Sequence, residues 1–152
     1  MNPKIEILLA TYNGEKYVGE QIDSIINQTY NNWELLIRDD NSKDRTLEIL
    51  KEYEKKDKRI KIIEDKKGNL GFVKNFEELL NNSKEDWVMF SDQDDYWLEN
   101  KIEKYVAILN TSSEDILKKP MLIHSNSFIC DDNLEIIKDE FINSKIANKY
   151  NE

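Results

Sequence analysis

Three carboxylates, Asp92, Asp94 and Asp95, crowd into a stretch of four residues directly after an apolar run that ends at Ser91. Magnesium and manganese ions prefer oxygen ligands, and two carboxylates one residue apart on a bend can face one ion that also binds phosphate oxygens. The spacing therefore predicts a divalent-cation site. The alternative is an acidic turn in solvent, which is common in a chain this rich in Asp and Glu.

Alternating strands and helices are expected to position these carboxylates. Short apolar runs rich in branched residues are typical of buried strands, and apolar residues at three- and four-residue steps indicate helices. This rule predicts strands at 4–10, 33–38, 60–63 and 87–91, and helices over about 15–28, 47–53, 72–80 and 98–109. Asn41 or Ser42 can cap the second helix. A further strand is predicted at 121–130, with a hairpin turn at 131–133 into 134–138.

This rhythm favours a mostly parallel sheet covered by helices on both faces, a Rossmann-like α/β layout. In such sheets ligands bind beyond the carboxyl ends of the strands, where the strand order reverses. Polar residues gather after each of the first four predicted strands, at 11–13, 39–40, 68–71 and 92–95. No proline- or glycine-rich linker interrupts the chain, so we predict one domain over residues 1–152.

Composition excludes several classes of protein. No apolar run approaches the roughly 20 residues of a membrane-spanning helix. The net charge of -9 argues against general binding of nucleic acid.

The lone cysteine, Cys130, excludes an internal disulfide, and we expect it to be buried. Residues 1–4 lead directly into a strand-like run with no visible signal peptide, which points to the cytoplasm. The basic run at 55–59 is expected to be a solvated helix end.

Several segments, taken together, resemble the family 2 inverting glycosyltransferases over roughly the first 110 residues. They are Ala10-Thr11-Tyr12-Asn13, Gln28-Thr29-Tyr30, Trp33-Glu34-Leu35-Leu36-Ile37, Asp39-Asp40-Asn41-Ser42 with Asp44 and Thr46, Asn69-x-Gly71-x-x-x-Asn75, and the DXD-like Asp92-Gln93-Asp94-Asp95. The resemblance implies a GT-A fold, a three-layer sandwich that binds a nucleotide-sugar and a divalent cation, Mg²⁺ or Mn²⁺.

The resemblance also implies roles for residues near the first two strands. It places Ala10, Thr11 and Tyr12, with Asn13 beside them, at the base and ribose, although Tyr12 could instead cap the core. It matches Asp40 to an acidic residue that accepts a hydrogen bond from the base. An ionised carboxylate only accepts, which suits the imide N–H of uracil or thymine. Asp39 either adds to this nucleotide site or orients the following turn.

Further roles fall on the third and fourth loops. Gly71, Lys74 and Asn75 would lie near the nucleotide, where backbone N–H groups and a helix N-terminus favour a negative ligand; the glycine loop could equally be a simple turn. By the family pattern Asp94 would bind the metal directly, and Asp92 would face the ribose or a metal-bound water. Asp95 either supports this pair or lies in solvent. Trp33, Trp87 and Trp97 are expected to pack in the core or at its rim, with Trp97 possible at the sugar site.

The implied reaction moves a sugar, with inversion, from a UDP- or dTDP-sugar to a polysaccharide or lipid-linked acceptor, in bacterial cell-wall or exopolysaccharide synthesis. The family's general base is an acidic residue well after the metal motif. No residue after Cys130 matches it convincingly, because Asp139 and Glu140 lie too close to the hairpin. We therefore predict a donor-binding part truncated on its acceptor side, with its catalytic residue unassigned. The segment around His124 resembles a subgroup that includes bacterial rhamnosyltransferases, but no role is assigned to His124.

Two alternatives remain. One is a non-catalytic nucleotide-sugar-binding module that lacks the base. The other is a receiver-type signalling domain, which fits poorly because its acidic pair should close the first strand, whereas that strand ends in Ala10-Thr11-Tyr12-Asn13. The expected partners are the sugar donor and a saccharide or lipid-linked acceptor, without nucleic acid. Peripheral association with the inner face of the plasma membrane would need regions outside this chain.

Overall fold

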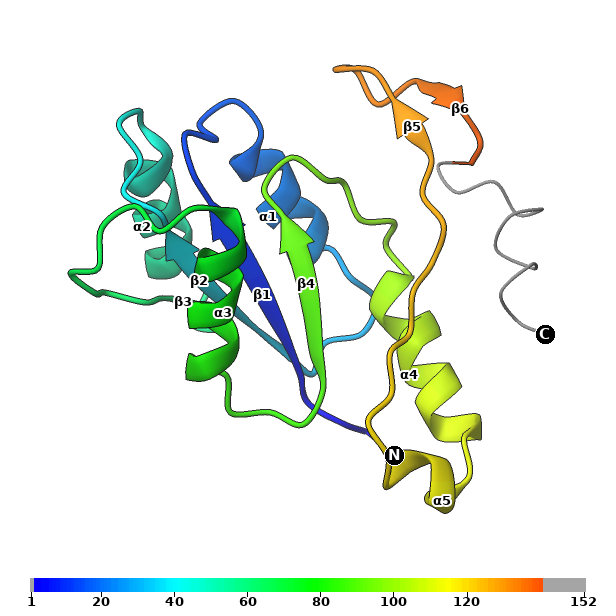
Figure 1. Cartoon of the computed structure of the whole chain (residues 1–152). Coiled ribbons are helices and arrows are strands. Elements are labelled where there is room, and N and C mark those ends of the chain that lie inside the picture. Colours follow the sequence, from blue (N-terminus) through cyan, green and yellow to red (C-terminus); the bar gives the residue numbers. More distant parts are fainter. Residues whose placement is uncertain (1, 141–152) are drawn as a thin grey trace. The chain divides into compact units, whose positions relative to one another are not determined.

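The computed structural model describes residues 2–140, and internal contacts group the chain into two compact units, one up to Ser112 and one from Ser113. We predicted one domain, and no proline- or glycine-rich linker marks this boundary. The first unit alternates strands and helices (Figure 1). Its elements are β1 (Ile5–Thr11), α1 (Val18–Ile26), β2 (Trp33–Asp39), α2 (Thr46–Lys56), β3 (Ile60–Ile62), α3 (Phe72–Asn82), β4 (Val88–Asp92) and α4 (Lys101–Thr111).

The four strands of the first unit form one parallel sheet in the order β3-β2-β1-β4, which confirms the predicted parallel sheet. All seven residues of β1 are buried, as its nearly continuous apolar sequence predicts for a central strand. The chain adds β2 and β3 on one side of β1 and then returns to place β4 on the other side. The strand order therefore reverses between β1 and β4.

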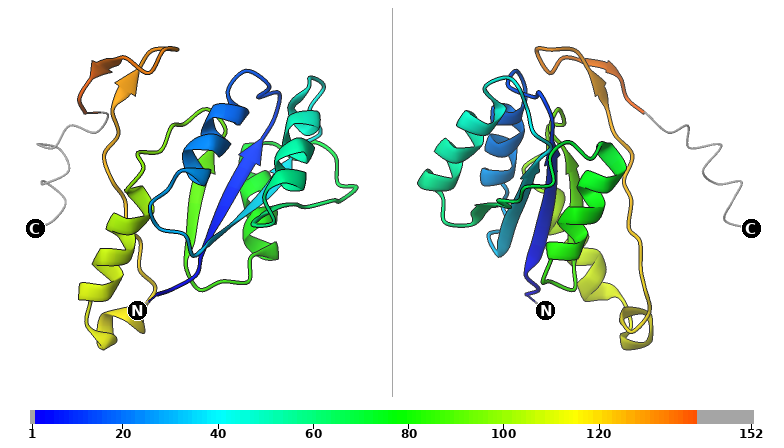
Figure 2. Two further views of the ribbon diagram at one scale, coloured as in Figure 1. Left: turned by 180° about the vertical axis from the view of Figure 1, so that it is seen from behind. Right: turned by 60° about the vertical axis from the view of Figure 1, so that its left-hand side comes forward.

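Helices cover both faces of this sheet and make three layers (Figure 2). Alternate residues of β1 point to opposite faces, so Ile7 and Leu9 pack on one side and Leu8 on the other. Helices α1, α2 and α4 bury their apolar residues with Ile7 and Leu9, and Trp97 joins this core at 2% exposure. Helix α3 covers the other face through Leu79. The sequence prediction of a three-layer α/β sandwich is confirmed.

Local interactions shift the predicted ends of two helices. Helix α1 begins at Val18 instead of residue 15, because the carbonyl of Gly14 accepts the N–H groups of both Tyr17 and Val18 in a tight turn. Helix α2 begins at Thr46, and neither predicted cap serves it. The backbone N–H and hydroxyl of Ser42 instead donate to Asp39, which fixes the turn after β2.

Helix α3 departs from the predicted apolar face. Leu79 is fully buried, but Phe72 and Val73 are 67% and 75% exposed. At the start of α3, Phe72 packs edge to face on Phe76, which packs in the same way on Phe90 of the edge strand β4. The apolar pattern alone did not distinguish a buried stripe from this exposed aromatic row.

The second unit contains α5 (Glu114–Leu117) and a two-stranded antiparallel ribbon of β5 (Ile129–Cys130) and β6 (Ile136–Lys138). The predicted hairpin turn is confirmed, and Asp131 stabilises it by accepting the N–H groups of Asn133 and Glu135. The predicted strand at 121–130 is wrong for residues 121–128, which are irregular and mostly exposed. A strand needs a neighbouring strand to pair with, and in the sheets formed by the described residues this segment takes no part.

Two smaller expectations concern the same region. Cys130 is exposed instead of buried, because the short ribbon that carries it has no apolar layer beneath it among the residues described. The polar sequence from residue 143 onward predicts a frayed tail, and this segment lies outside the described residues. Across residues 2–140, we find no helix that is both long and apolar enough to span a bilayer.

Candidate functional site

A cleft of about 410 Å³ opens at the carboxyl edge of the sheet. Residue pairing sets Ala10 beside Asp92, so β1 and β4 end next to each other at the point where the strand order reverses. All four predicted polar loops contribute to the cleft wall. The wall consists of Ala10, Thr11, Tyr12, Asp40, Asn69, Gly71, Phe72, Asn75, Asp92, Gln93 and Asp94. The volume lies within the range of small-molecule sites, about 300–1,000 Å³.

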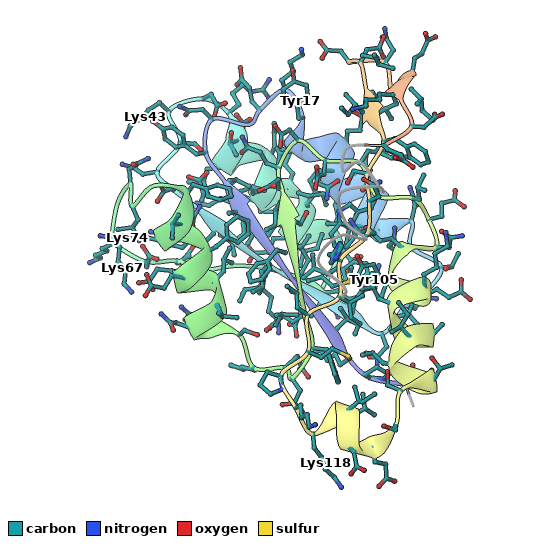
Figure 3. All side chains as sticks on the ribbon, turned by 45° about the vertical axis from the view of Figure 1, so that its right-hand side comes forward. Tyr17, Lys43, Lys67, Lys74, Tyr105 and Lys118 are labelled. Carbon is teal, nitrogen blue, oxygen red and sulfur yellow. The ribbon has the colours of Figure 1, made fainter. Side chains whose placement is uncertain are left out.

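Three of the predicted site residues are not among those that line the cleft. Asn13 has a left-handed backbone, and its amide oxygen accepts the N–H of Lys43. Asp39 accepts the hydroxyl of Thr11 at 3.0 Å, consistent with orienting the turn. Lys74 points outward from α3 near Lys67, as Figure 3 shows. Their roles toward a nucleotide stay predictions.

Asp40 is the most constrained carboxylate on the cleft wall, at 2% exposure. Its Oδ1 accepts the Leu70 N–H at 2.7 Å and Arg38 Nη1 at 2.8 Å, and its Oδ2 accepts the Gly71 N–H at 2.7 Å. Burial opposes the charged form of Asp40, but these backbone and guanidinium donors outweigh it and lower its pKa. Asp40 is therefore an anion that uses three of its roughly four acceptor positions.

The glycine loop is shaped to supply those backbone donors. Gly71 has φ of 82°, in the left-handed region that favours glycine, and its N–H and that of Leu70 both meet Asp40. The Gly71 carbonyl then accepts the N–H of Asn75, so α3 begins directly behind the loop. Asn69 donates its side-chain amide to the Asp40 carbonyl at 3.0 Å. The loop is thus a built wall of the cleft and more than a simple turn.

Gln93 ties the acidic turn to the loop after β1. Its Oε1 accepts the Tyr12 N–H at 2.8 Å, and its Nε2 donates to the Tyr12 carbonyl at 3.1 Å. Gly14 makes room for this amide, since a Cβ there would lie 2.3 Å from Gln93 Oε1. Tyr12 is 47% exposed, so it lines the cleft instead of capping the core.

The acidic turn places Asp92 and Asp94 on the cleft wall, with Asp95 beside them. Partial desolvation and the neighbouring charges of Asp95 and Asp94 raise the pKa of Asp92. Desolvation also raises the pKa of Asp95, with Lys101 opposing and Asp94 adding to the shift. The raised pKa values mean that burial and mutual repulsion destabilise the ionised carboxylates of this turn. A bound cation would stabilise their ionised forms.

The donor set of the turn fits a particular kind of metal site. Residues 2–140 contain no group of three or more histidine, cysteine or acidic side chains arranged to hold an ion. Magnesium in nucleotide sites is usually bound by one or two carboxylates together with phosphate oxygens and water. Asp92 and Asp94 supply that smaller set, so they suit a cation that is completed by a phosphorylated ligand.

Comparison with known proteins identifies the class that this fold and cleft define. Residues 6–126 match the profile of Glycosyl transferase family 2, and the chain belongs to that family. An uncharacterised glycosyltransferase of Haemophilus influenzae is 42% identical over 107 residues, which cover 70% of this chain and 33% of that protein. The sheet and its helices are the GT-A fold, as in S. aureus TarS (residues 1–349) solved with UDP-GlcNAc. That structure superposes with a TM-score of 0.64 at 28% identity, covering 70% of this chain and 31% of the solved 1–349 chain.

A third relative has a defined reaction in its name. The Escherichia coli UDP-Glc:alpha-D-GlcNAc-diphosphoundecaprenol beta-1,3-glucosyltransferase WfgD is 36% identical over 107 residues, covering 69% of this chain and 40% of WfgD. The chain spans about a third of the length of the first relative and 38% and 42% of the next two. The family match over residues 6–126 contains the whole cleft wall, from Ala10 to Asp94.

Sequence reasoning missed four residues that build the cleft. Asn69 was noted only as part of a motif, and Gln93 stood between acidic residues without a role of its own. Phe72 belongs to the apolar pattern that predicts the helix over 72–80, and its exposed ring lines the cleft. Arg38 is fully buried behind the wall, and its position at the end of an apolar strand was the signal that could have drawn attention to it.

Proposed function

We propose that this chain binds the nucleoside-diphosphate part of a sugar donor in the cleft and forms the donor-binding part of an inverting, metal-dependent glycosyltransferase. One observation carries the proposal. A single cleft at the reversal of strand order is lined both by Asp40, a buried acceptor, and by the carboxylates Asp92 and Asp94. One end of that wall suits a base and the other suits a metal-bound diphosphate.

The base end favours uracil or thymine. Asp40 is fixed by three donors and has capacity for about one more, which an imide N–H can supply. Thr11 and Ala10 border the same region, and Tyr12 offers a half-exposed ring against which a planar base can stack. A UDP- or dTDP-sugar is therefore the proposed donor, and the UDP-GlcNAc bound by TarS supports this choice.

Asp94 and Asp92 would hold Mg²⁺ or Mn²⁺. When bound, the ion neutralises the charge that develops on the leaving diphosphate. The chain's own residues bind the base, fix the ribose and present the anomeric carbon, which an acceptor hydroxyl attacks with inversion. The general base and the acceptor site are proposed to lie outside this chain. A saccharide or lipid-linked acceptor at the cytoplasmic face of the membrane is proposed, supported by the lipid-linked acceptor in the name of WfgD.

Thermal shift with UDP, dTDP, GDP and ADP, each with Mn²⁺, Mg²⁺ or chelator, tests the binding step. A ligand at 100 times its dissociation constant adds roughly 2.7 kcal/mol to stability. We expect stabilisation by UDP or dTDP that requires metal and disappears in Asp94→Ala. The matched control is Asp86→Ala, an exposed aspartate that lies just before the other end of β4. Stabilisation that survives both chelation and Asp94→Ala overturns the metal assignment.

A non-catalytic nucleotide-sugar-binding module is the second candidate, because no general base is identified in the described chain. Sugar-nucleotide hydrolysis and transfer by this chain can be compared with those of a chain fused to the acceptor part of a longer relative. We expect binding by both and transfer only by the fusion. Full-rate transfer by this chain alone contradicts the absence of a base, and a fusion that binds without transfer favours the module.

A further inference from the structure

Arg38 carries a guanidinium that is 1% exposed, at the end of β2 and behind the cleft wall. Its Nε and Nη2 donate to the two oxygens of Asp65 at 2.8 and 3.3 Å. Its Nη2 also donates to the Gly68 carbonyl at 3.1 Å, and its Nη1 donates to Asp40 at 2.8 Å and to Asn75 at 2.9 Å. These five bonds match the five N–H donors of a guanidinium.

These partners all belong to segments that build the cleft. Asp40 directly follows β2, Gly68 belongs to the loop before α3, and Asn75 lies on the first turns of α3. Asn75, itself 3% exposed, also donates its amide to the carbonyls of Arg38 and Thr11. Arg38 therefore joins the end of β2, the 65–71 loop and the start of α3, and its partner Asn75 adds the end of β1.

Burial of the Arg38 guanidinium costs desolvation free energy, because the charge leaves water and is then stabilised only by its hydrogen-bond partners. Leu36, which lies two residues earlier on the same face of β2, is apolar and partly buried in the core that Leu8 and Leu79 form. An apolar residue at position 38 would fill the same strand without that cost. All five hydrogen bonds of Arg38 go to segments that build the cleft. This indicates that the buried guanidinium serves to hold the cleft wall rigid.

We propose that Arg38 is the positioning residue of the nucleotide site: it pre-forms the wall by holding Asp40, the 65–71 loop and Asn75 in their binding arrangement, without touching the ligand. This inference rests on the proposed function. Arg38 is absent from the cleft lining, so its effect must pass through Asp40 and the backbone of Leu70 and Gly71. Pre-organised walls raise affinity by lowering the ordering cost of binding.

The variant series follows from the geometry. Arg38→Met keeps the stem length and removes all five donors. Arg38→Lys keeps the charge but has three donors at one point, so it cannot bridge Asp65 and Asn75 together. Asp65→Asn removes the negative charge of the residue that accepts two hydrogen bonds from Arg38. The Asp65 side chain is 22% exposed and does not line the cleft. Arg45→Met is the matched control, because the Arg45 side chain is 70% exposed and lies on α2's N-terminal side.

The test combines backbone hydrogen exchange with UDP titration in the presence of Mn²⁺. In Arg38→Met and Arg38→Lys we expect the Leu70 and Gly71 amides to exchange at least about tenfold faster while amides of β1 keep their protection, and the UDP dissociation constant to rise by about tenfold to a hundredfold. Asp65→Asn should shift both readouts in the same direction by less, and Arg45→Met should change neither.

The outcomes separate this inference from the proposed function. If the wild-type chain binds no nucleotide, the proposed function fails, and the exchange of Leu70 and Gly71 still tests the loop-holding role. If the amides of β1 and of the 65–71 loop lose protection equally in both Arg38→Met and Asp65→Asn, then Arg38 stabilises the whole fold and not the cleft wall in particular. That result overturns the inference. Unchanged UDP affinity in Arg38→Met with wild-type binding intact overturns it as well.

Discussion

Asp40→Asn is the substitution whose cost can be worked most directly from the structure. The best orientation of the new amide keeps its oxygen toward Arg38 and Leu70 and turns its NH₂ toward the Gly71 N–H, which then loses its acceptor. A donor left without a partner costs about 1–3 kcal/mol. The lost charge next to the buried Arg38 adds about 1 kcal/mol, a small share because Asp65 still neutralises the guanidinium. The expected loss is about 2–4 kcal/mol of unfolding free energy at pH 7.

Urea unfolding followed by circular dichroism measures this loss, and the melting temperature should fall by roughly 4–16 °C. The pH dependence provides a second check. The folded-state pKa of Asp40 lies below its unfolded value, so its stabilising contribution is complete above about pH 4 and is lost as the pH falls through the folded pKa. Because Asn does not titrate, the gap between wild type and Asp40→Asn should shrink on acidification. A gap below about 0.5 kcal/mol at pH 7, or one that widens in acid, refutes the reasoning.

Other predictions address packing and ionisation. Gly14→Ala should displace the Gln93 amide and weaken UDP binding as much as Gln93→Ala does, by calorimetry; unequal effects would count against the close approach. Trp97→Ala should cost about 3–5 kcal/mol in urea unfolding, because Trp97 is 2% exposed, and a loss under about 1 kcal/mol is inconsistent with a core role. Burial and the hydrogen bond to Asp23 raise the pKa of Tyr53 to about 12, so ultraviolet titration of wild type against Tyr53→Phe should show a tyrosine that is still neutral at pH 10.5. That preference for the neutral hydroxyl stabilises the fold below about pH 10 and is lost as the pH rises toward the folded value.

The sheet was predictable because its sequence signals are strong and local. The fully buried run of β1 and the polar residues after each strand specify a parallel sheet with its ligand edge, and the strand order then brings those residues to one cleft. The strand at 121–128 was predicted wrongly because an apolar pattern states a tendency, while a strand forms only with a partner for its backbone groups.

The interior of the site was less predictable. Whether Phe72 is buried in the core or exposed on the cleft wall depends on how the start of α3 is placed against the sheet, which sequence spacing does not encode. Arg38 bonds Asp40 nearby but also Asn75, which lies 37 positions away, and Gln93 bonds Tyr12 at a separation of 81 positions. No local window of sequence contains these networks. The family resemblance predicts that Asp40 contacts the base. Only the structure shows that Asp40 also accepts the backbone N–H groups of Leu70 and Gly71 in the 65–71 loop.

A crystal structure of this chain grown with UDP and Mn²⁺ tests the central claim most directly, through the anomalous signal of manganese and the position of the base. The account predicts one manganese peak at the carboxylate of Asp94, bridged to the diphosphate, with the uracil imide N–H on Asp40. Manganese bound elsewhere, or a nucleotide outside the cleft, would contradict it.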